Sequence, residues 1–368
     1  MLAGTAQKVR RLGRLITIWL VIPVRSEGPL HFADIEITAS FVVCSTVAHK
    51  MVNSAMDTQT VPPKTTAMDT ATTVLLRELI DYAGLFPPAS LPMSQSVENY
   101  DTYLRSESNW ILGRFIVPVA RLDEFEHAFA TLPTRAPEKG LQMRLSALLD
   151  SDVEADIDRI NEFNARAAFK EAVKRAVVES VEVKVANAAD IKRLAAVIPS
   201  ELATYFEIPL SGGEEECIAA AAESGRCAKI RTGGETADKF PESENVIEFM
   251  CQCAAANVSF KATAGLHHPL RSVHRLTYRP ESASGMMHGF INVFLAAAFL
   301  RAGMAANLAV QLLEEQSAQA FRFAPEVVSW REHKLTRVEI AATRQNAISF
   351  GSCSFTEPVD DLKSLHLL

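Results

Sequence analysis

Two lysines in similar segments are the residues of this sequence best suited to covalent chemistry. Lys229 lies in AKIRTGG (228–234) and Lys261 lies in FKATAGL (260–266), and small residues follow each lysine. Two ammonium groups held close together in a partly desolvated site depress each other's pKa. A neutral amine can then attack a substrate carbonyl and form a Schiff base. The pair predicts one nucleophilic lysine and one lysine that perturbs its pKa.

Each lysine belongs to a short β-rich run, and the runs alternate with helical stretches rich in Ala, Glu, Lys and Arg. The centres of the runs lie roughly 22 to 37 residues apart, which is the length of one strand with its crossover helix. The rhythm predicts a (β/α)8 barrel, with an open doubly wound sheet as the alternative. No GxGxxG segment follows the first run, which favours the barrel. The six clearest runs are 114–118, 143–149, 181–185, 204–210, 227–231 and 258–263.

Residues 320–323 and 347–355 are the candidate seventh and eighth strands. Between the sixth and seventh strands, 289–302 and 305–315 read as two largely apolar helices, and we expect a helical insertion over about 285–318. These helices could cover the barrel or form the contact of a homo-oligomer through 289–315.

One parity of the six runs is apolar and the other is repeatedly charged. If the apolar parity faces the helices, the charged parity points into the barrel. Burial of so many ionisable groups costs several kcal/mol each unless they are paired or face an anion. Alternatively, long side chains at strand ends reach solvent. The charged residues are Arg114, Arg144, Glu182, Lys184, Glu207, Lys229, Arg231 and Lys261.

This inward set carries six positive and two negative charges. A surplus of four positive charges, inside a chain of net charge −7, argues for a small anionic ligand that bears phosphate or carboxylate. The carboxyl ends of barrel strands form active sites, so we expect the ligand to bind there. The expected substrate-binding residues are Arg231, Lys184, Glu182, Arg144, Arg114, Thr263, Gly233, Gly234 and His268.

His267 and His268 follow the sixth run directly, in an expected loop. Either could act as an acid/base or as a metal ligand, with Glu207 and Glu182 as oxygen donors across the cavity. No HxH or HExxH spacing is present, so we expect no metal and no other cofactor. Together with the two lysines, Glu207 and His267 complete the expected catalytic set, either of them serving as proton shuttle.

The segment 227–268 resembles class I aldolases of the deoxyribose-phosphate aldolase type, which carry a Lys-Thr-x-Thr-Gly strand followed by a Lys-Ala-x-Gly-Gly strand. The resemblance implies that Lys229 forms the Schiff base and that Lys261 perturbs it. The family uses its sixth strand for the first lysine, whereas the runs counted here place Lys229 on the fifth. A glycine turn that could bind phosphate, FGSCS (350–354), comes 90 residues after Lys261.

Two further strings, DYAGLFPP (81–88) and GLHHP (265–269), resemble an uncharacterised bacterial protein family of (β/α)8 barrels, which implies no particular activity. We expect the first helix to start near Met68, with Asp69 or Thr70 as its cap. Asp81 and Tyr82 are expected to end this helix and to have a structural role.

Composition restricts the class of protein. An acidic chain is a poor binder of nucleic acid, and no apolar run reaches the 18 residues that a membrane helix needs. Six cysteines without a CxxC pair predict reduced thiols and a cytoplasmic location. Residues 1–67 differ in character from the rest, and we expect a disordered or dispensable extension ahead of a single barrel domain over 68–368.

The sequence therefore predicts a barrel lyase of aldolase type that acts by Schiff-base chemistry on a small phosphorylated or carboxylated carbonyl compound. Two alternatives stay open. One is a metal-dependent lyase or hydrolase that uses His267, His268 and Glu207. The other is a barrel that binds an anionic metabolite without catalysis.

Overall fold

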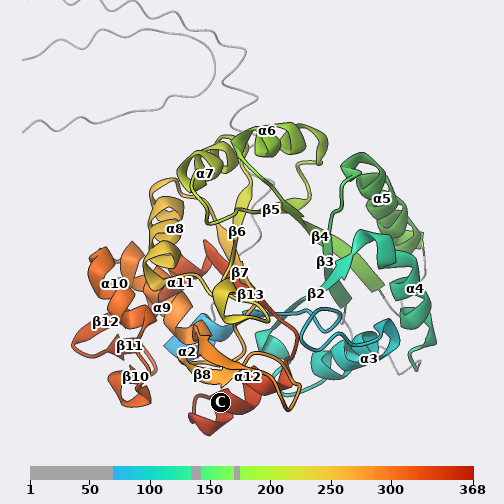
Figure 1. The fold of residues 1–368 in the computed structure, drawn as a ribbon. Coiled ribbons are helices and arrows are strands. Elements are labelled where there is room, and N and C mark those ends of the chain that lie inside the picture. Colours follow the sequence, from blue (N-terminus) through green and yellow to red (C-terminus); the bar gives the residue numbers. More distant parts are fainter. Residues whose placement is uncertain (1–68, 134–141, 170–174) are drawn as a thin grey trace, which may run out of the picture. The chain divides into compact units, whose positions relative to one another are not determined.

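Eight parallel strands close into a barrel in the computed structural model, which describes residues 69–133, 142–169 and 175–368 (Figure 1). Each strand pairs with its neighbours in chain order, and the last strand closes the barrel by pairing with the first. The strands are β1 (Ile80–Tyr82), β2 (Leu112–Pro118), β3 (Gln142–Leu148), β4 (Arg175–Lys184), β5 (Ala203–Glu207), β6 (Cys227–Arg231), β7 (Phe260–Thr263) and β13 (Ala347–Ser352). The predicted (β/α)8 fold is confirmed.

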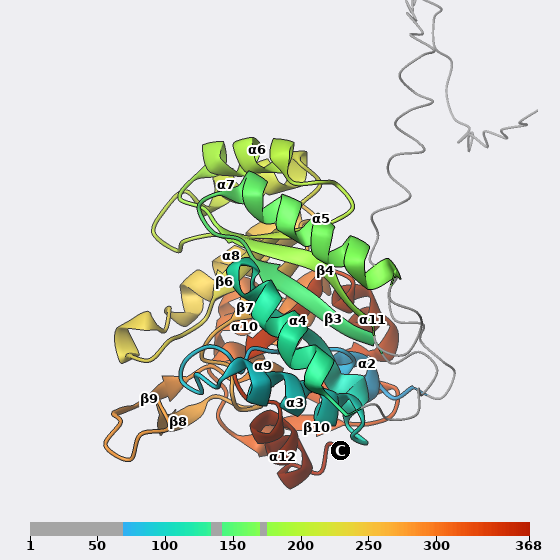
Figure 2. The same cartoon turned by 90° about the vertical axis from the view of Figure 1, so that its right-hand side faces the viewer.

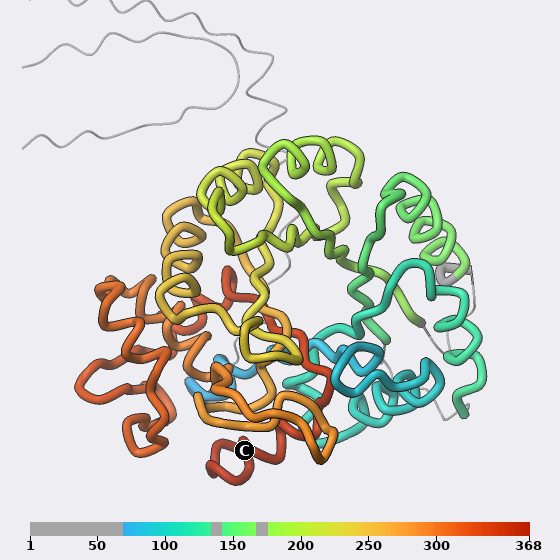
Figure 3. Tube along the Cα trace, in the orientation of Figure 1, coloured from blue at the N-terminus to red at the C-terminus, as the bar shows by residue number. Residues whose placement is uncertain are grey.

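Helices form the outer layer of this barrel and connect successive strands, as the tube in Figure 3 shows. Except for α9, these helices bury an apolar stripe against the strands and leave their polar side in solvent. The helices of this layer are α3 (Met93–Leu104), α4 (Leu122–Thr131), α5 (Val153–Phe169), α6 (Ala188–Val197), α7 (Glu214–Glu223), α8 (Ser243–Ala255), α9 (Phe290–Arg301) and α11 (Arg337–Arg344).

The first barrel strand was missed by the sequence analysis. The expected first helix is α2 (Ala71–Leu76), capped by Thr70, whose hydroxyl accepts a hydrogen bond from the backbone N–H of Thr73. It ends after six residues, and the chain then enters β1, which pairs with β2 and β13. Asp81 and Tyr82 therefore lie on a barrel strand rather than at a helix end.

The expected seventh strand was wrong. Residues Phe321–Phe323 form β10, which pairs with β11 (Val327–Trp330) and β12 (His333–Thr336) in a separate antiparallel sheet. The true seventh strand is β7, and the chain between β7 and β13 is correspondingly long. It includes the hairpin β8 (Ser272–Arg275) and β9 (Ser284–Met287), α9, α10 (Ala306–Leu313) and this sheet. The helical insertion thus precedes the eighth strand.

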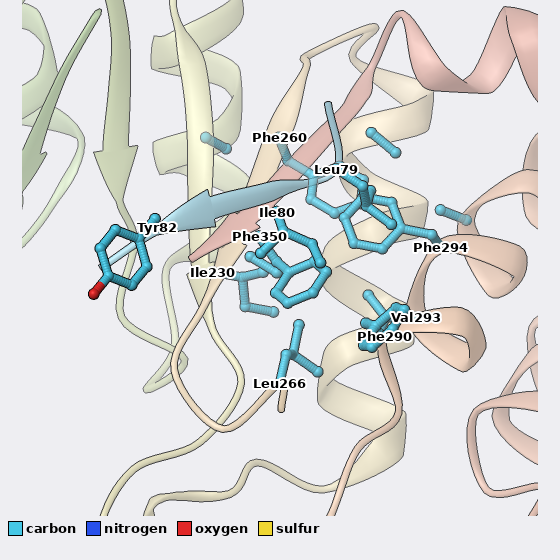
Figure 4. Packing of buried hydrophobic residues seen from close by; sticks show 14 of the residues in the cluster. Leu79, Ile80, Tyr82, Ile230, Phe260, Leu266, Phe290, Val293, Phe294 and Phe350 are labelled. Atoms are coloured by element: carbon cyan, nitrogen blue, oxygen red, sulfur yellow. The ribbon is translucent and has the colours of Figure 1, made fainter. Parts of the chain in front are cut away.

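Helix α9 is apolar on all sides because the chain covers all of them. Ten of its twelve residues are buried, and it packs against α8, α10, α11 and β13. Figure 4 shows Phe290 and Phe294 of this helix beside Phe350 of β13, with ring centroids 5.0 and 6.1 Å from that of Phe350. The apolar surface of α9 is used within the chain, and an oligomer contact through 289–315 stays a prediction.

The final helix, α12 (Thr356–Ser364), follows β13 directly. The hairpin β8–β9 and the loop after β6 project from one end of the barrel (Figure 2). Within the described ranges, no helix is both long and apolar enough to cross a membrane. The expected extension 1–67 lies outside the described residues.

Candidate active site

Charged side chains from strands that are not neighbours meet inside the barrel. Glu182 on β4 contacts Lys261 on β7, although β5 and β6 lie between those strands. Asp81 on β1 contacts Lys261 across β13. Side chains can span such gaps only through the lumen, so the predicted inward orientation is confirmed for Glu182 and Lys261, and Asp81 shares it.

Lys229 on β6 lies between two carboxylates. Its Nζ is 2.7 Å from Oε2 of Glu182 and 2.8 Å from Oε2 of Glu207 on β5. Only 6% of the Lys229 side chain is exposed, against 12% for Glu207. Oε1 of Glu207 in turn lies 3.4 Å from Nε of Arg231, whose side chain is 47% exposed. The site thus becomes more open from Lys229 towards Arg231.

Lys261 is held deeper by a second pair of carboxylates. Its Nζ is 2.6 Å from Oδ2 of Asp81 and 2.7 Å from Oε1 of Glu182, and it lies 4.8 Å from the centre of the Tyr205 ring. Lys229 and Lys261 occupy matching positions in the β6–β7 register. Glu182 therefore bridges the two ammonium groups, one on each oxygen, and Ser146 donates a further hydrogen bond to Oε1 at 2.8 Å.

These carboxylates reverse the expected effect of the lysines on each other. Burial alone would lower the pKa of Lys229, but Glu182 and Glu207 outweigh it and the pKa rises above its usual value. The pKa of Lys261 also rises, since Asp81 and Glu182 outweigh burial. The expected mutual depression of the two pKa values is therefore wrong for the free protein. Both lysines rest as ammonium groups.

The pKa values of the carboxylates shift in the opposite direction, downwards. Burial would raise the pKa of Glu182, yet the two ammonium groups hold it well below its usual range. The pKa of Glu207 is lowered in the same way, against burial, chiefly by Lys229. The centre thus contains two cations and three carboxylates, and every charge in it is paired.

Asp81 is the functional candidate that sequence reasoning missed. It is fully buried, and besides Lys261 it accepts hydrogen bonds from Ser349 Oγ (2.8 Å) and from the backbone N–H of Arg114 (2.6 Å). Gly113 makes room for this carboxylate, because a Cβ at that position would overlap Oδ1. One signal in the sequence could have identified it. Asp81 is an acidic residue between Ile80 and Tyr82, just ahead of a turn, and so shows the alternation of apolar and charged residues seen in the other strands.

Several predicted binding residues lie at the carboxyl ends of the strands. Lys184 is exposed and pairs with Glu207 in the β4–β5 register, so it lies beside Arg231 at the same mouth. Thr263 ends β7, and its carbonyl accepts hydrogen bonds from Thr232. Gly233 and Gly234 lie in the loop after β6.

The glycines of this end serve close packing. A Cβ on Gly233 would stand 2.8 Å from Cα of Gly265, which has a φ of +74° in the loop after β7. A Cβ on Gly234 would stand 2.8 Å from Cβ of Lys239. The loop after β6 and the loop after β7 can therefore approach each other only because Gly233 and Gly265 lack side chains.

The predicted surplus of four positive charges is largely neutralised. Arg114 and Arg144 do not join the lysines: they form ion pairs nearer the amino-terminal ends of the strands. The set of inward charges predicted from the sequence did not include three carboxylates, and these reduce the surplus from four positive charges to one. The added pairs are Lys261–Asp81, Arg114–Glu179 and Arg144–Glu78.

The two histidines face α12 rather than Glu207. Nδ1 of His267 lies 3.4 Å from Oε2 of Glu357, and Nδ1 of His268 lies 2.6 Å from Oδ2 of Asp361. The two histidines thus have acidic partners on α12, while Glu207 pairs with Lys229 and Arg231. In the described part of the chain, no group of three or more His, Cys, Asp and Glu side chains is arranged to hold a metal ion.

The additional strand β1 changes the position of Lys229 in the barrel. Counted from β1, Lys229 is on the sixth strand and Lys261 on the seventh, which removes the difference from the strand numbering of the aldolases noted above. No protein-family model matches the chain, and no curated protein matches it with significant similarity.

Proposed function

We propose that this chain is a carbon–carbon lyase of aldolase type that forms a Schiff base between Lys229 and a small anionic carbonyl compound. The observation that carries the proposal is the position of Lys229 Nζ between two carboxylates, at 2.7 and 2.8 Å, beside a second buried lysine. A structural ion pair needs one carboxylate for each lysine. Shared, bridging carboxylates additionally provide a route for protons.

Attack on a carbonyl begins with loss of a proton from Lys229. Glu207 accepts that proton, so that the ion pair becomes a neutral amine and a neutral acid without net charge entering the site. The amine nitrogen bonds to the carbonyl carbon, and the carbonyl electron pair moves to oxygen. Glu207 returns its proton to that oxygen, and water then leaves as the iminium forms.

Cleavage uses the iminium as an electron sink. A base removes the proton of the β-hydroxyl group, the carbon–carbon bond breaks, and its electron pair moves towards the iminium nitrogen to give an enamine and an aldehyde. Glu207 at the open side is placed for this proton. Lys261 gives up the proton that reaches the enamine carbon, with the carboxylate of Glu182 as relay, and the proton held by Glu207 then restores the ammonium group of Lys261 by the same route. Water releases the second product from Lys229.

The anionic group of the substrate binds at the mouth. Lys184 and Arg231 flank Glu207 there, and both are exposed enough to exchange water for a phosphate or carboxylate. Arg114 and Arg144 stay in their ion pairs and contribute through the field inside the lumen.

Turnover on a panel of β-hydroxy aldehydes and β-hydroxy ketones that bear a phosphate or carboxylate tests this proposal. Release of aldehyde is measured for the wild type and for Lys229→Met. We expect cleavage of at least one compound, and loss of that cleavage in the variant. Cleavage that survives in Lys229→Met would contradict the proposal.

The same panel separates the two alternatives. Cleavage that is lost with a chelator and restored by a divalent metal indicates a metal-dependent enzyme. Tight binding of a compound, with no aldehyde released, indicates a barrel that only binds its ligand.

A further inference from the structure

A second group of reactive side chains lies at the carboxyl ends of β7 and β13, apart from the lysines. It consists of Cys353, His267, Glu357 and Tyr278, which we call the Cys353 cluster. These residues come from four elements: the loop after β7, the segment after β13, helix α12 and the connection between β8 and β9. The proposed lyase mechanism uses no thiol.

The thiol of Cys353 has two polar neighbours. Its Sγ lies 3.5 Å from the hydroxyl of Tyr278 and 3.9 Å from Nδ1 of His267. Glu357 completes the cluster: its Oε2 lies 3.4 Å from the same Nδ1 and accepts a hydrogen bond from Tyr278 at 3.0 Å. A carboxylate thus favours the protonated imidazole beside the sulfur, and an imidazolium stabilises a thiolate.

The other four described cysteines have no such surroundings. Burial raises the pKa of each thiol, to about 11 for Cys227, and further upward for Cys253. Burial and nearby carboxylates also raise the pKa of the Cys217 and Cys251 thiols. By contrast, the pKa of His267 next to Cys353 is raised to about 9: burial lowers it, and Cys353 and Glu357 outweigh that effect.

We propose that Cys353 is a nucleophilic thiol, activated by His267, that reacts with soft carbon electrophiles. In the reaction with an α-haloamide, Sγ bonds to carbon, and the halide leaves with the electron pair of the broken bond. The proton of the thiol rests on Nδ1 of His267 before the attack, where Glu357 stabilises it, and it is released to solvent after the sulfur–carbon bond has formed. When the thiolate forms, Tyr278 turns its one hydroxyl hydrogen from Glu357 towards the sulfur, and its ring covers the sulfur.

Exposure and chemistry predict opposite orders of reactivity. Cys353 is only 5% exposed, whereas Cys227 and Cys251 are partly exposed. If access decided the rate, these two would react first. If the Cys353 cluster decides it, the most enclosed of the three thiols reacts first. Access then requires Tyr278, which is 53% exposed, to move outward.

Alkylation of the native full-length protein with iodoacetamide tests this inference, with each cysteine followed by peptide mass spectrometry over time. We expect Cys353 to react at least tenfold faster than Cys227 and Cys251 at pH 7. Between pH 8 and pH 6.5 its rate should fall less than threefold. The rate at an ordinary thiol falls about tenfold per pH unit below its pKa.

Two variants and one matched control identify the activating group. In His267→Gln the rate at Cys353 should fall at least tenfold and acquire the ordinary pH dependence, while the rates at Cys227 and Cys251 report an unchanged fold. Tyr278→Phe, which keeps the ring as cover, should lower the rate about threefold. His333→Gln should leave it unchanged, because His333 lies on β12 and its ring stacks on Trp330.

The inference is overturned if Cys353 reacts no faster than Cys227, or if its rate follows pH as an ordinary thiol does. It is also overturned if His267→Gln folds and leaves the rate unchanged. Where that variant does not fold, an unchanged rate and pH dependence in Tyr278→Phe decides against the cluster. None of these outcomes depends on Lys229.

Discussion

The lumen of this barrel contains two sets of ion pairs that differ in one chemical property. Nearer the amino-terminal ends of the strands, the cations are arginines: Arg114 pairs with Glu179, and Arg144 with Glu78. Further along, the cations are Lys229 and Lys261. A guanidinium does not lose its proton in proteins, whereas a buried ammonium group can become a neutral amine.

The arrangement of the carboxylates differs as well. Each arginine has a carboxylate partner that is itself 32% or 43% exposed. The lysines share Glu182, which is 4% exposed, and each has one further carboxylate. Two cations in each set thus support two roles: the arginines form separate structural ion pairs, and the bridged lysines can exchange protons.

Exchange of lysine for arginine at the centre should have the largest effect. Lys229→Arg keeps the charge but removes the nucleophilic amine, so cleavage of the best substrate should fall at least about 1,000-fold. Arg144→Lys makes the reverse exchange at an arginine pair and should change the rate less than about threefold. Steady-state kinetics on both variants checks this, and a rate loss of similar size in the two would remove the distinction.

Removal of one carboxylate from each set compares their stabilities. Glu182→Gln leaves two buried ammonium groups short of a partner and should lower the free energy of unfolding by about 3–5 kcal/mol. Glu179→Gln removes a partly exposed partner and should cost about 1 kcal/mol or less. Urea denaturation of both variants measures the difference. Equal losses would show that bridging adds nothing.

The pH dependence of stability should follow the bridged centre. The pKa values of Glu182 and Glu207 are lowered by folding, so their contribution is present above the ordinary pKa and is lost as pH falls below it. The pKa of Lys229 is raised, so its contribution is present below its ordinary pKa and is lost as pH rises through the higher folded value.

Urea midpoints between pH 3 and pH 11 test both limbs. Stability should be nearly constant from about pH 5.5 to pH 9.5 and should fall on either side, as far as these groups determine it. Glu207→Gln should make the acid limb shallower, and the part that remains is the contribution of Glu182. An acid limb that Glu207→Gln does not alter would assign it to other carboxylates.

The smallest effect is expected where a backbone position holds the centre. Gly113→Ala places a Cβ against the carboxylate of Asp81 and should cost about 1–3 kcal/mol of unfolding free energy. The cost should shrink when Gly113→Ala is combined with Asp81→Ala, because the smaller side chain leaves room. Urea denaturation of the two single variants and the double variant forms a double-mutant cycle. If the two losses of unfolding free energy simply add, the added Cβ does not act through Asp81.

The sequence predicted the barrel and much of its centre, because alternation exposes inward residues wherever a strand is long enough to show it. Glu182, Lys229 and Lys261 were found in that way. Asp81 was not, since its strand has three residues and follows a helical run that masks the change of period. A short strand carries too few residues to show alternation.

The wrong seventh strand and the wrong histidine partners have another cause. Phe321–Phe323 is a genuine strand, and sequence patterns do not distinguish a strand of the barrel from one of a separate sheet. The partners of His267 and His268 lie on α12, some 90 residues later in the chain. Only tertiary structure brings these segments together. It also shows that Glu182 and Glu207, which the sequence placed inside the barrel, contact the lysines directly and reverse the expected pKa shifts.

Reductive trapping tests the central claim most directly. The protein is incubated with a carbonyl substrate and sodium borohydride, which reduces an iminium to a stable secondary amine, and the modified residue is located by peptide mass spectrometry. The account predicts one substrate-derived adduct, on Lys229, and none in Lys229→Arg. Cleavage of the same substrate without any adduct, or with the adduct on Lys261 or another lysine, would contradict it.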